Sequence, residues 1–182
     1  MRDPAPPHAN EGPHALWHVS GESGIQRFEP RLGGSYLPAQ AFVWAIDTRH
    51  LPLYWFPREC PRATFWAGKR TTAADVKLLG GSERVHAIED GWIERMRAAE
   101  VCAYRLPAAV FERHPDVGGY WLSRVVVEPL ETRRLHDLAQ LHEQAGIELR
   151  VIPNLWPLWN KITSSTLEFS GIRLRNARPA PA

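Results

Sequence analysis

A histidine lies in the middle of the first apolar run of the chain, Leu16–Ser20 (LWHVS), whose composition is typical of a strand. The next segment, GESGIQRFEPR, contains turn-forming residues and indicates a loop. A titratable ring on a strand next to such a flexible loop can bind a ribose hydroxyl or a phosphate. The competing interpretation is that His18 is half-buried and that the backbone satisfies its ring.

Two further clusters combine aromatic and polar side chains. The run FVWAI predicts a strand that contains Trp44, and a helix over residues 49–56 that carries Tyr54 follows it. An aromatic stripe on such a helix is more typical of a core than of a site. Arg49 offers the paired donors that bind phosphate, or it forms an ion pair with a nearby carboxylate. The third cluster, YWLS, begins at Tyr120.

Known catalytic and metal-binding patterns are missing from the sequence. It contains no GxGxxG, GxxxxGK or GxSxG run, which argues against Rossmann cofactors, P-loop nucleotides and serine-hydrolase chemistry. His136, His142 and Glu143 lack the spacing of a zinc helix, and Cys60 and Cys102 belong to no CxxC pair. We therefore expect no metal, and we interpret His142 as a core residue and both cysteines as reduced.

Composition indicates a folded protein without an extensive charged surface. An apolar fraction of 44% and eight tryptophans argue against disorder. A net charge of +2 and the absence of a basic run argue against a nucleic-acid partner. No apolar run approaches the roughly 20 residues that span a bilayer, and the N-terminus lacks the apolar segment of a signal peptide. We expect a cytoplasmic protein without membrane contact.

Many short strands interspersed with a few helices predict an α+β fold with a split, mainly antiparallel sheet and flanking helices. Predicted helices include one from Thr132 to Ala145 and an amphipathic one from Asn154 to about Thr166, and residues 67–82 are predicted as a mobile loop. A single domain is expected over residues 13–177. Residues 1–12 and 178–182 are expected to be a disordered lead-in and tail.

Most of the chain from residue 16 to 177 resembles an uncharacterised bacterial family, a domain of unknown function. The stretches that carry this resemblance are LWHVSGESGIQRFEPR, FVWAIDTRHLPLYWFPRECPRATFW, GYWLSRVVVEPL, GIELRVIPNLWPLW and TLEFSGIRLRNA. The resemblance implies no activity.

The same order of segments also resembles the ADP-ribosyltransferase superfamily. There, a histidine on the first strand holds a ribose of NAD, an aromatic residue of the second motif packs on nicotinamide, and a late acid stabilises the oxocarbenium-like transition state. His18 matches the first position and Tyr54 the second. The late position falls on Gly119 or Tyr120, so this chain has no acid there, and Glu128 lies several residues away.

The resemblance implies an ADP-ribosyltransferase-like fold that binds NAD or another small nucleotide. Candidate catalytic residues are His18, Tyr54 and Tyr120; candidate cofactor-binding residues are His18, Ser20, Arg31, Trp44 and Arg49. Three functions stay open: a divergent transferase or NAD glycohydrolase with an unknown macromolecular acceptor, a non-catalytic small-molecule binding module, and a protein-interaction module. We predict that His18 and Tyr54 line one pocket.

Overall fold

The computed structural model describes residues 15–32 and 40–181, which form two compact units. The first unit comprises residues 56–99 and 136–181, and the second comprises the described residues up to 55 together with residues 100–135. The predicted lead-in over residues 1–12 lies outside the described residues. The expectation of a single domain stays a prediction.

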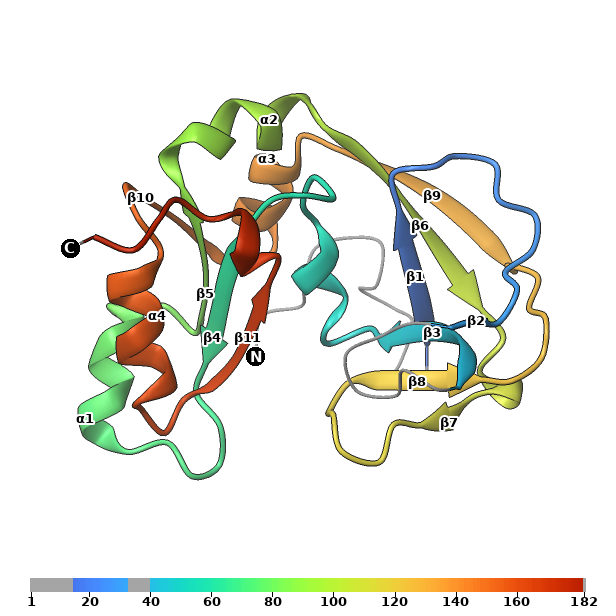
Figure 1. Cartoon of the computed structure of the whole chain (residues 1–182), viewed down its shortest axis with the longest axis horizontal. Helices are drawn as coiled ribbons and strands as arrows, with labels where there is room; N and C mark the ends of the chain where they lie inside the picture. The colour runs from blue at the N-terminus through green and yellow to red at the C-terminus, as the bar shows by residue number, and fades with distance from the viewer. Residues whose placement is uncertain (1–14, 33–39, 182) are drawn as a thin grey trace. The chain divides into compact units, whose positions relative to one another are not determined.

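The second unit is built around a sheet with the strand order β7-β8-β3-β1-β6-β9, and β2 pairs with β3 (Figure 1). The pairings β1–β3, β1–β6, β2–β3, β3–β8 and β7–β8 are antiparallel. Its strands are β1 (Leu16–Ser20), β2 (Arg31–Leu32), β3 (Ala41–Asp47), β6 (Glu100–Leu106), β7 (Glu112–Arg113), β8 (Tyr120–Ser123) and β9 (Glu131–His136). Two 3-10 helices accompany them, η1 (Leu51–Tyr54) and η4 (Ala108–Val110).

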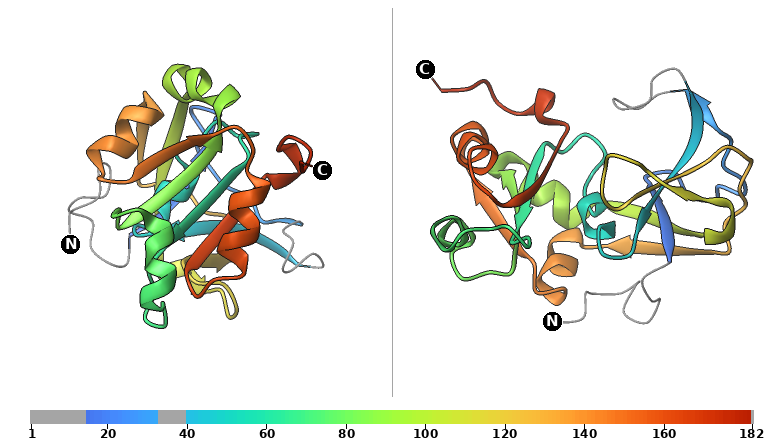
Figure 2. Two further views of the ribbon diagram at one scale, coloured as in Figure 1. Left: turned by 90° about the vertical axis from the view of Figure 1, so that its left-hand side faces the viewer. Right: turned by 90° about the horizontal axis from the view of Figure 1, so that it is seen from below.

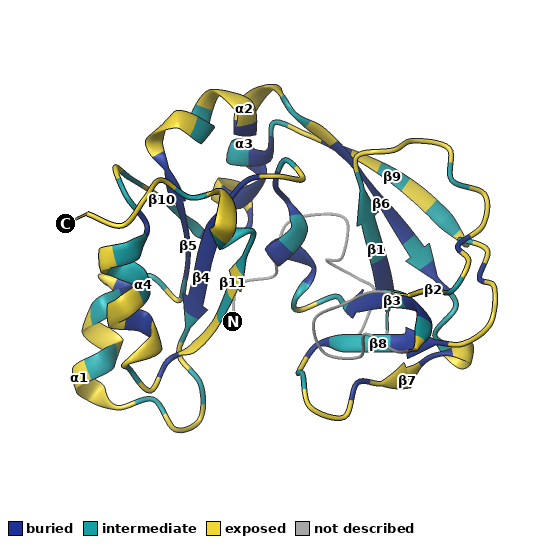
Figure 3. Cartoon of the chain, in the orientation of Figure 1, coloured by how far each residue is buried: buried dark blue, intermediate teal, exposed yellow. Residues whose placement is uncertain are grey.

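Alternation along β1 and its neighbours produces the core of the second unit. Leu16 on β1, Val43 on β3 and Tyr104 on β6 belong to one buried cluster, because every second side chain of a strand points to the same face. Figure 3 shows β3 and β6 as largely buried strands, whereas β1 is buried at Leu16 and Trp17 and half-buried beyond them. Phe28 joins this cluster from the loop after β1, where its backbone bridges to Val127.

The first unit contains a smaller sheet with the order β10-β5-β4-β11, in which only the β10–β5 pair is parallel. Its strands are β4 (Arg62–Trp66), β5 (Arg84–Glu89), β10 (Glu148–Ile152) and β11 (Glu168–Ile172). Its helices are α1 (Ala73–Val76), η2 (Lys77–Leu79), η3 (Asp90–Trp92), α2 (Ile93–Ala98), α3 (Leu138–Gln144), α4 (Trp156–Thr163) and η5 (Leu174–Asn176).

Helices cover both faces of this smaller sheet, and Figure 2 shows α3 and α4 on opposite sides of it. Ile162 of α4 packs in a buried cluster with Phe65 of β4 and Val85 of β5. On the other face, the ring of His86 on β5 contacts the ring of His142 on α3. The expectation that His142 is a core residue is confirmed, since it is fully buried.

The predicted α+β class with mainly antiparallel sheets is confirmed. The strand prediction at Leu16–Ser20 matches β1 at both ends. Among the described residues, no helix is long and apolar enough to cross a membrane. Cys60 and Cys102 are buried free thiols, as expected.

The predicted helix from Thr132 to Ala145 is wrong in its first half. Residues Glu131–His136 form strand β9, and helix α3 begins only after Asp137. Asp137 adopts a left-handed backbone conformation (φ 44°), and its carboxylate accepts a hydrogen bond from the backbone N–H of Gln140. The capping residue was therefore misplaced, because Thr132 carries the same sequence signal as Asp137.

The predicted loop over residues 67–82 is also wrong, because α1 and η2 form within it. The Thr72 side chain caps α1, and the Asp75 carboxylate accepts hydrogen bonds from the backbone and side chain of Thr166. Leu79 is buried in the cluster beneath α4. Side-chain caps and one apolar contact outweigh the glycine content on which the loop prediction depended.

Other predicted elements are shorter in the structure. The helix over residues 49–56 is the 3-10 helix η1, and the amphipathic helix after Asn154 ends at Thr163. Strand β8, which contains the YWLS cluster, ends at Ser123, and Val127 beyond it forms a single bridge with Phe28. In the segment predicted as a tail, the backbone N–H of Arg178 donates to the Glu89 carboxylate.

Candidate functional site

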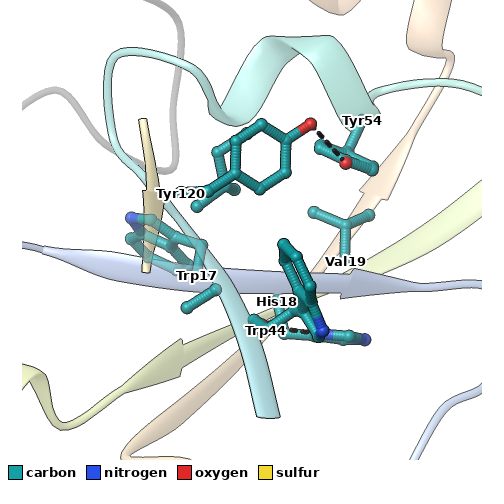
Figure 4. Close-up of a pocket in the computed structure, with 8 residues that line it drawn as sticks. Trp17, His18, Val19, Trp44, Tyr54 and Tyr120 are labelled. Carbon is teal, nitrogen blue, oxygen red and sulfur yellow. Dashed lines mark hydrogen bonds between the residues drawn. The ribbon is translucent and has the colours of Figure 1, made fainter. Parts of the chain in front are cut away.

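A hollow opens in the second unit where β1, β3, η1 and β8 meet (Figure 4). It holds about 310 Å³ of empty space, part of which is open to solvent. The lining is mostly aromatic and includes one imidazole and two phenols, and the surface that it exposes to the hollow is almost entirely apolar. The lining residues are Trp17, His18, Val19, Trp44, Ala45, Ile46, Tyr54 and Tyr120.

His18 is held by one hydrogen bond to the backbone: its Nδ1 lies 2.9 Å from the carbonyl oxygen of Trp44. A carbonyl can only accept, so Nδ1 carries the hydrogen, and the neutral ring has its lone pair on Nε2. The β1–β3 ladder pairs Trp17 with Ile46. Beyond the Trp17–Ile46 pair, Nδ1 of the His18 imidazole donates a hydrogen bond to the Trp44 carbonyl.

Burial lowers the pKa of the His18 imidazole below its ordinary value. The hydrogen bond to Trp44 opposes this shift, and the positive charge of Arg31 adds to it. The ring is therefore uncharged at neutral pH and offers a hydrogen-bond acceptor. The backbone therefore satisfies Nδ1, while Nε2 has no partner among the described residues, and the binding of a ligand by His18 stays a prediction.

Two tyrosines complete the polar part of the lining. The hydroxyls of Tyr54 and Tyr120 lie 2.8 Å apart, and Figure 4 shows their side chains joined at this point. The Tyr120 ring meets the rings of Trp44 and Tyr54 at 80° and 81°. These edge-to-face contacts fix the orientation of three aromatic walls.

Asp47 forms hydrogen bonds with the two segments that carry Tyr54 and Tyr120. Its carboxylate accepts hydrogen bonds from the backbone N–H of His50, at 3.0 Å, and from Nδ1 of the same residue, at 2.7 Å. Its own N–H donates to the carbonyl of Gly119 at 2.8 Å. Asp47 therefore connects the start of η1, which carries Tyr54, to the residue that precedes Tyr120.

The structure brings four of the predicted site residues together around the hollow and leaves three outside its lining. His18, Trp44, Tyr54 and Tyr120 line it, as expected for His18 and Tyr54 in particular. Of the other three, the Ser20 hydroxyl accepts a hydrogen bond from the backbone of Glu22, Arg31 is exposed on β2, and Arg49 is exposed before η1. The roles assigned to all seven residues stay predictions.

Sequence reasoning missed four of the lining residues, namely Trp17, Val19, Ala45 and Ile46. It also missed Phe28, whose ring packs against the His18 ring at a centroid distance of 4.7 Å. The lining takes consecutive residues of β1 and of β3, so alternation along a strand could not identify them. Phe28 lies in the loop that follows β1, and its aromatic character is the only sequence signal that could identify it as a neighbour of the hollow.

The eight lining residues include no carboxylate. Glu128, the acid that follows the YWLS segment, is exposed after Val127. In the part of the chain that the structure describes, no three histidine, cysteine or acidic side chains are grouped as a metal site would require. The arrangement can therefore bind a ring and accept a hydrogen bond, and charge stabilisation must come from outside the lining.

Replacing Gly119 by alanine is expected to destabilise the protein by about 2–4 kcal/mol. Its φ of +84° disfavours other residues, and an added Cβ would lie 2.4 Å from Nδ1 of His50. Gly118 is the matched control, because a Cβ there meets nothing within 4 Å. Urea unfolding of both variants checks this: equal midpoints for Gly119→Ala and Gly118→Ala would contradict the expectation.

A protein-family comparison identifies one match, which covers residues 17–177 and is described as a family of unknown function (DUF6886). No curated protein and no solved structure matches the chain. These results agree with the resemblance to an uncharacterised family.

Proposed function

The chain belongs to the DUF6886 family of unknown function, and we propose from its site that it binds a small nucleotide, with NAD as the first ligand to test. The observation that carries this proposal is the uncharged, backbone-held imidazole of His18 beside three oriented aromatic rings. The hollow takes one ring system, and the remainder of the ligand extends outside it.

The size of the hollow supports a single ring. The empty space of about 310 Å³ includes open solvent, so the enclosed part admits at most one ring of a ligand and not a whole dinucleotide. Planar rings gain from contact with aromatic walls such as those of Trp44 and Tyr120.

The polar chemistry supports a hydroxyl-bearing ligand. Nε2 of His18 is an acceptor, so it binds a group that donates, such as a ribose hydroxyl. The neutral imidazole gives little attraction to a phosphate. Arg31 lies near enough for its charge to lower the pKa of His18, and its exposed guanidinium is available to a phosphate outside the hollow.

The choice of NAD depends on the resemblance to the ADP-ribosyltransferase superfamily. His18 and Tyr54 occupy its first two motif positions, and both side chains line the hollow. Tyr120 stands at the late position, where the superfamily has an acid. Because a phenol cannot offset the positive charge of an oxocarbenium ion as a carboxylate does, we propose binding as the function and make turnover an outcome of the test.

The test compares ligand binding by the wild-type protein and by His18→Asn. An asparagine amide can still donate to the Trp44 carbonyl but places no acceptor where Nε2 lies. We expect NAD, ADP-ribose or AMP at 100 times its dissociation constant to stabilise the wild type by about 2.7 kcal/mol. His18→Asn should bind the same ligand about 3–10-fold more weakly at a similar melting temperature, the effect of one hydrogen bond.

Calorimetric titration and thermal shift measure these quantities, and nicotinamide release measures turnover. Ser164→Ala is the control, because the Ser164 hydroxyl donates to the Asn160 carbonyl at the end of α4 and lies outside the lining. If no nucleotide binds the wild type, the proposal is wrong. It also fails if His18→Asn binds as tightly as the wild type, since the hollow would then not be the site.

A further inference from the structure

Two histidines touch in the interior of the first unit, away from the hollow. Nδ1 of His86 on β5 lies 2.9 Å from Nε2 of His142 on α3, and both side chains are fully buried. Nδ1 of His142 lies 2.6 Å from the carbonyl oxygen of Leu138 in the same helix. The ring of Phe56 packs against both imidazoles, with centroid distances of 5.6 and 4.9 Å.

These contacts allow one arrangement of hydrogens in the neutral pair. The Leu138 carbonyl accepts, so His142 carries its hydrogen on Nδ1 and accepts at Nε2. His86 must then donate from Nδ1, which leaves a lone pair on its Nε2. That Nε2 is buried and has no hydrogen-bond partner in the described part of the chain.

A third proton cannot be added without harming this arrangement. If His86 takes it, Nε2–H of His86 becomes a buried donor without an acceptor. If His142 takes it at Nε2, His86 must accept at Nδ1 and move its own hydrogen to Nε2. In both cases the same buried atom carries an unsatisfied hydrogen, which costs free energy as well as the burial of a charge.

The charges that act on the pair oppose protonation further. Arg62 on β4 and Arg84 on β5 are the charged side chains that act on both rings, and both are positive. Arg62 is itself buried, and its guanidinium lies over the ring of Phe56 at 4.8 Å. A protonated imidazole would thus be a second cation beside a buried arginine.

The charged side chains on β10 and α2 described next form contacts with groups other than the two histidines. On β10, the residue paired with His86 is Leu149, and its neighbours Glu148 and Arg150 bind each other. On α2, which packs on α3, Arg97 forms an ion pair with Glu94. Burial raises the pKa of the Cys60 thiol to about 12, so that it carries no negative charge. Arg95 of α2 stacks on Trp92.

We propose that the His86–His142 contact is an acid-sensitive lock that holds α3 against the four-stranded sheet, and that protonation of the pair releases the helix. The contact joins two elements that are distant in the sequence, so its loss detaches α3 from β5. Phe56 and the face of β5 that bears His86 then become accessible.

The expected pH window follows from the buried state of the rings. Burial lowers the pKa of His142 from 6.5 to about 4, and burial together with the charge of His142 lowers that of His86 well below 6.5. A folded-state pKa below the open-state value means that the closed form is favoured above pH 6.5 and loses this advantage as the pH falls toward 4. His142 alone shifts the closed-to-open equilibrium roughly 20-fold between pH 7 and pH 5.

Amide hydrogen exchange of the full chain at pH 7 and pH 5, corrected for the intrinsic effect of pH, tests the proposal. In the wild type, the protection of residues 138–144 should fall about 20-fold or more, and by more than that of β4. The variant His86→Phe/His142→Leu replaces both partners with apolar groups, which preserves stability best when a buried pair is removed. Its α3 should be equally protected at both pH values.

His136→Gln is the control for a histidine outside the pair, and it should behave as the wild type does. Unchanged protection of α3 in the wild type at pH 5 would overturn the proposal, as would an equal loss in the double variant. If the double variant fails to fold, ring NMR of the wild type decides. Protonation of both rings in place, with α3 still protected, also overturns the proposal.

Discussion

Replacing Glu89 by alanine is expected to lower the free energy of unfolding by about 3–5 kcal/mol. The carboxylate is 2% exposed and lies at the end of β5. One oxygen accepts from the backbone N–H of Leu155 at 3.2 Å, and both accept from the N–H of Arg178 at 3.1 and 3.0 Å. Alanine leaves both donors without this acceptor.

The position of Glu89 explains the size of this effect. Leu155 precedes α4, so the carboxylate satisfies an N–H at the start of that helix, where a negative charge is also favourable. Arg178 lies in the C-terminal segment, which is held further by the bond from the Trp156 indole to the Arg178 carbonyl. Loss of Glu89 therefore weakens the attachment of both segments to the sheet.

Glu94→Ala is the matched control, because Glu94 is an exposed glutamate that pairs with Arg97 on the same helix. Such pairs contribute about 0.3–0.5 kcal/mol. Chemical denaturation at pH 7 compares the variants, and Glu89→Gln, which keeps one acceptor oxygen, should fall between them. Equal costs at positions 89 and 94 would show that Glu89 has no special role.

Local patterns in the sequence were sufficient for much of the fold. The apolar run of β1 predicts that strand, and its first two residues are buried. The spacing of Leu158 and Ile162 predicts the buried side of α4 in the same way. Both predictions concern short segments in which the order of apolar and polar residues indicates which side is buried.

The sequence-based predictions fail where two nearby residues carry the same local signal, or where a contact joins residues that are distant in the sequence. Thr132 and Asp137 are both acceptable helix caps, and only the pairing of β9 in the sheet selects Asp137. His86 and His142 are 56 positions apart, so the sequence shows two separate core residues where the structure has one hydrogen-bonded pair. Tertiary contacts determine which residue caps the helix and which histidines pair, and local sequence propensities do not encode such contacts.

At the candidate site too, some features could be predicted from the sequence and others depend on tertiary contacts. The histidine of β1 and the tyrosine of η1 were identified from residue chemistry and family resemblance, and they do line one hollow. The hydroxyl contact between Tyr54 and Tyr120 and the tautomer of His18 depend on how β8 and β3 pair, which no local pattern encodes. The sequence suggested a ring donor at His18, whereas the geometry leaves an acceptor at Nε2.

The second large effect is expected for Phe28→Ala, which should cost about 3–5 kcal/mol of stability. The Phe28 ring is 8% exposed and packs between His18, at 4.7 Å, and Tyr104, at 5.3 Å. Its removal opens a cavity in the core of the second unit and removes one wall that keeps water from His18. The pKa of His18, which burial lowers, should rise toward its ordinary value.

Phe169→Ala is the control, since Phe169 on β11 is 42% exposed and its truncation removes far less buried surface. Urea unfolding should show a small cost there, and NMR titration of the His18 ring should show no shift. Phe28→Leu keeps most of the volume and should cost about 1 kcal/mol, with the pKa of His18 close to that of the wild type. A rise in that pKa in Phe28→Ala but not in Phe28→Leu links the uncharged state of the imidazole to the ring beside it. An unchanged pKa in Phe28→Ala would mean that residues other than Phe28 exclude water from His18.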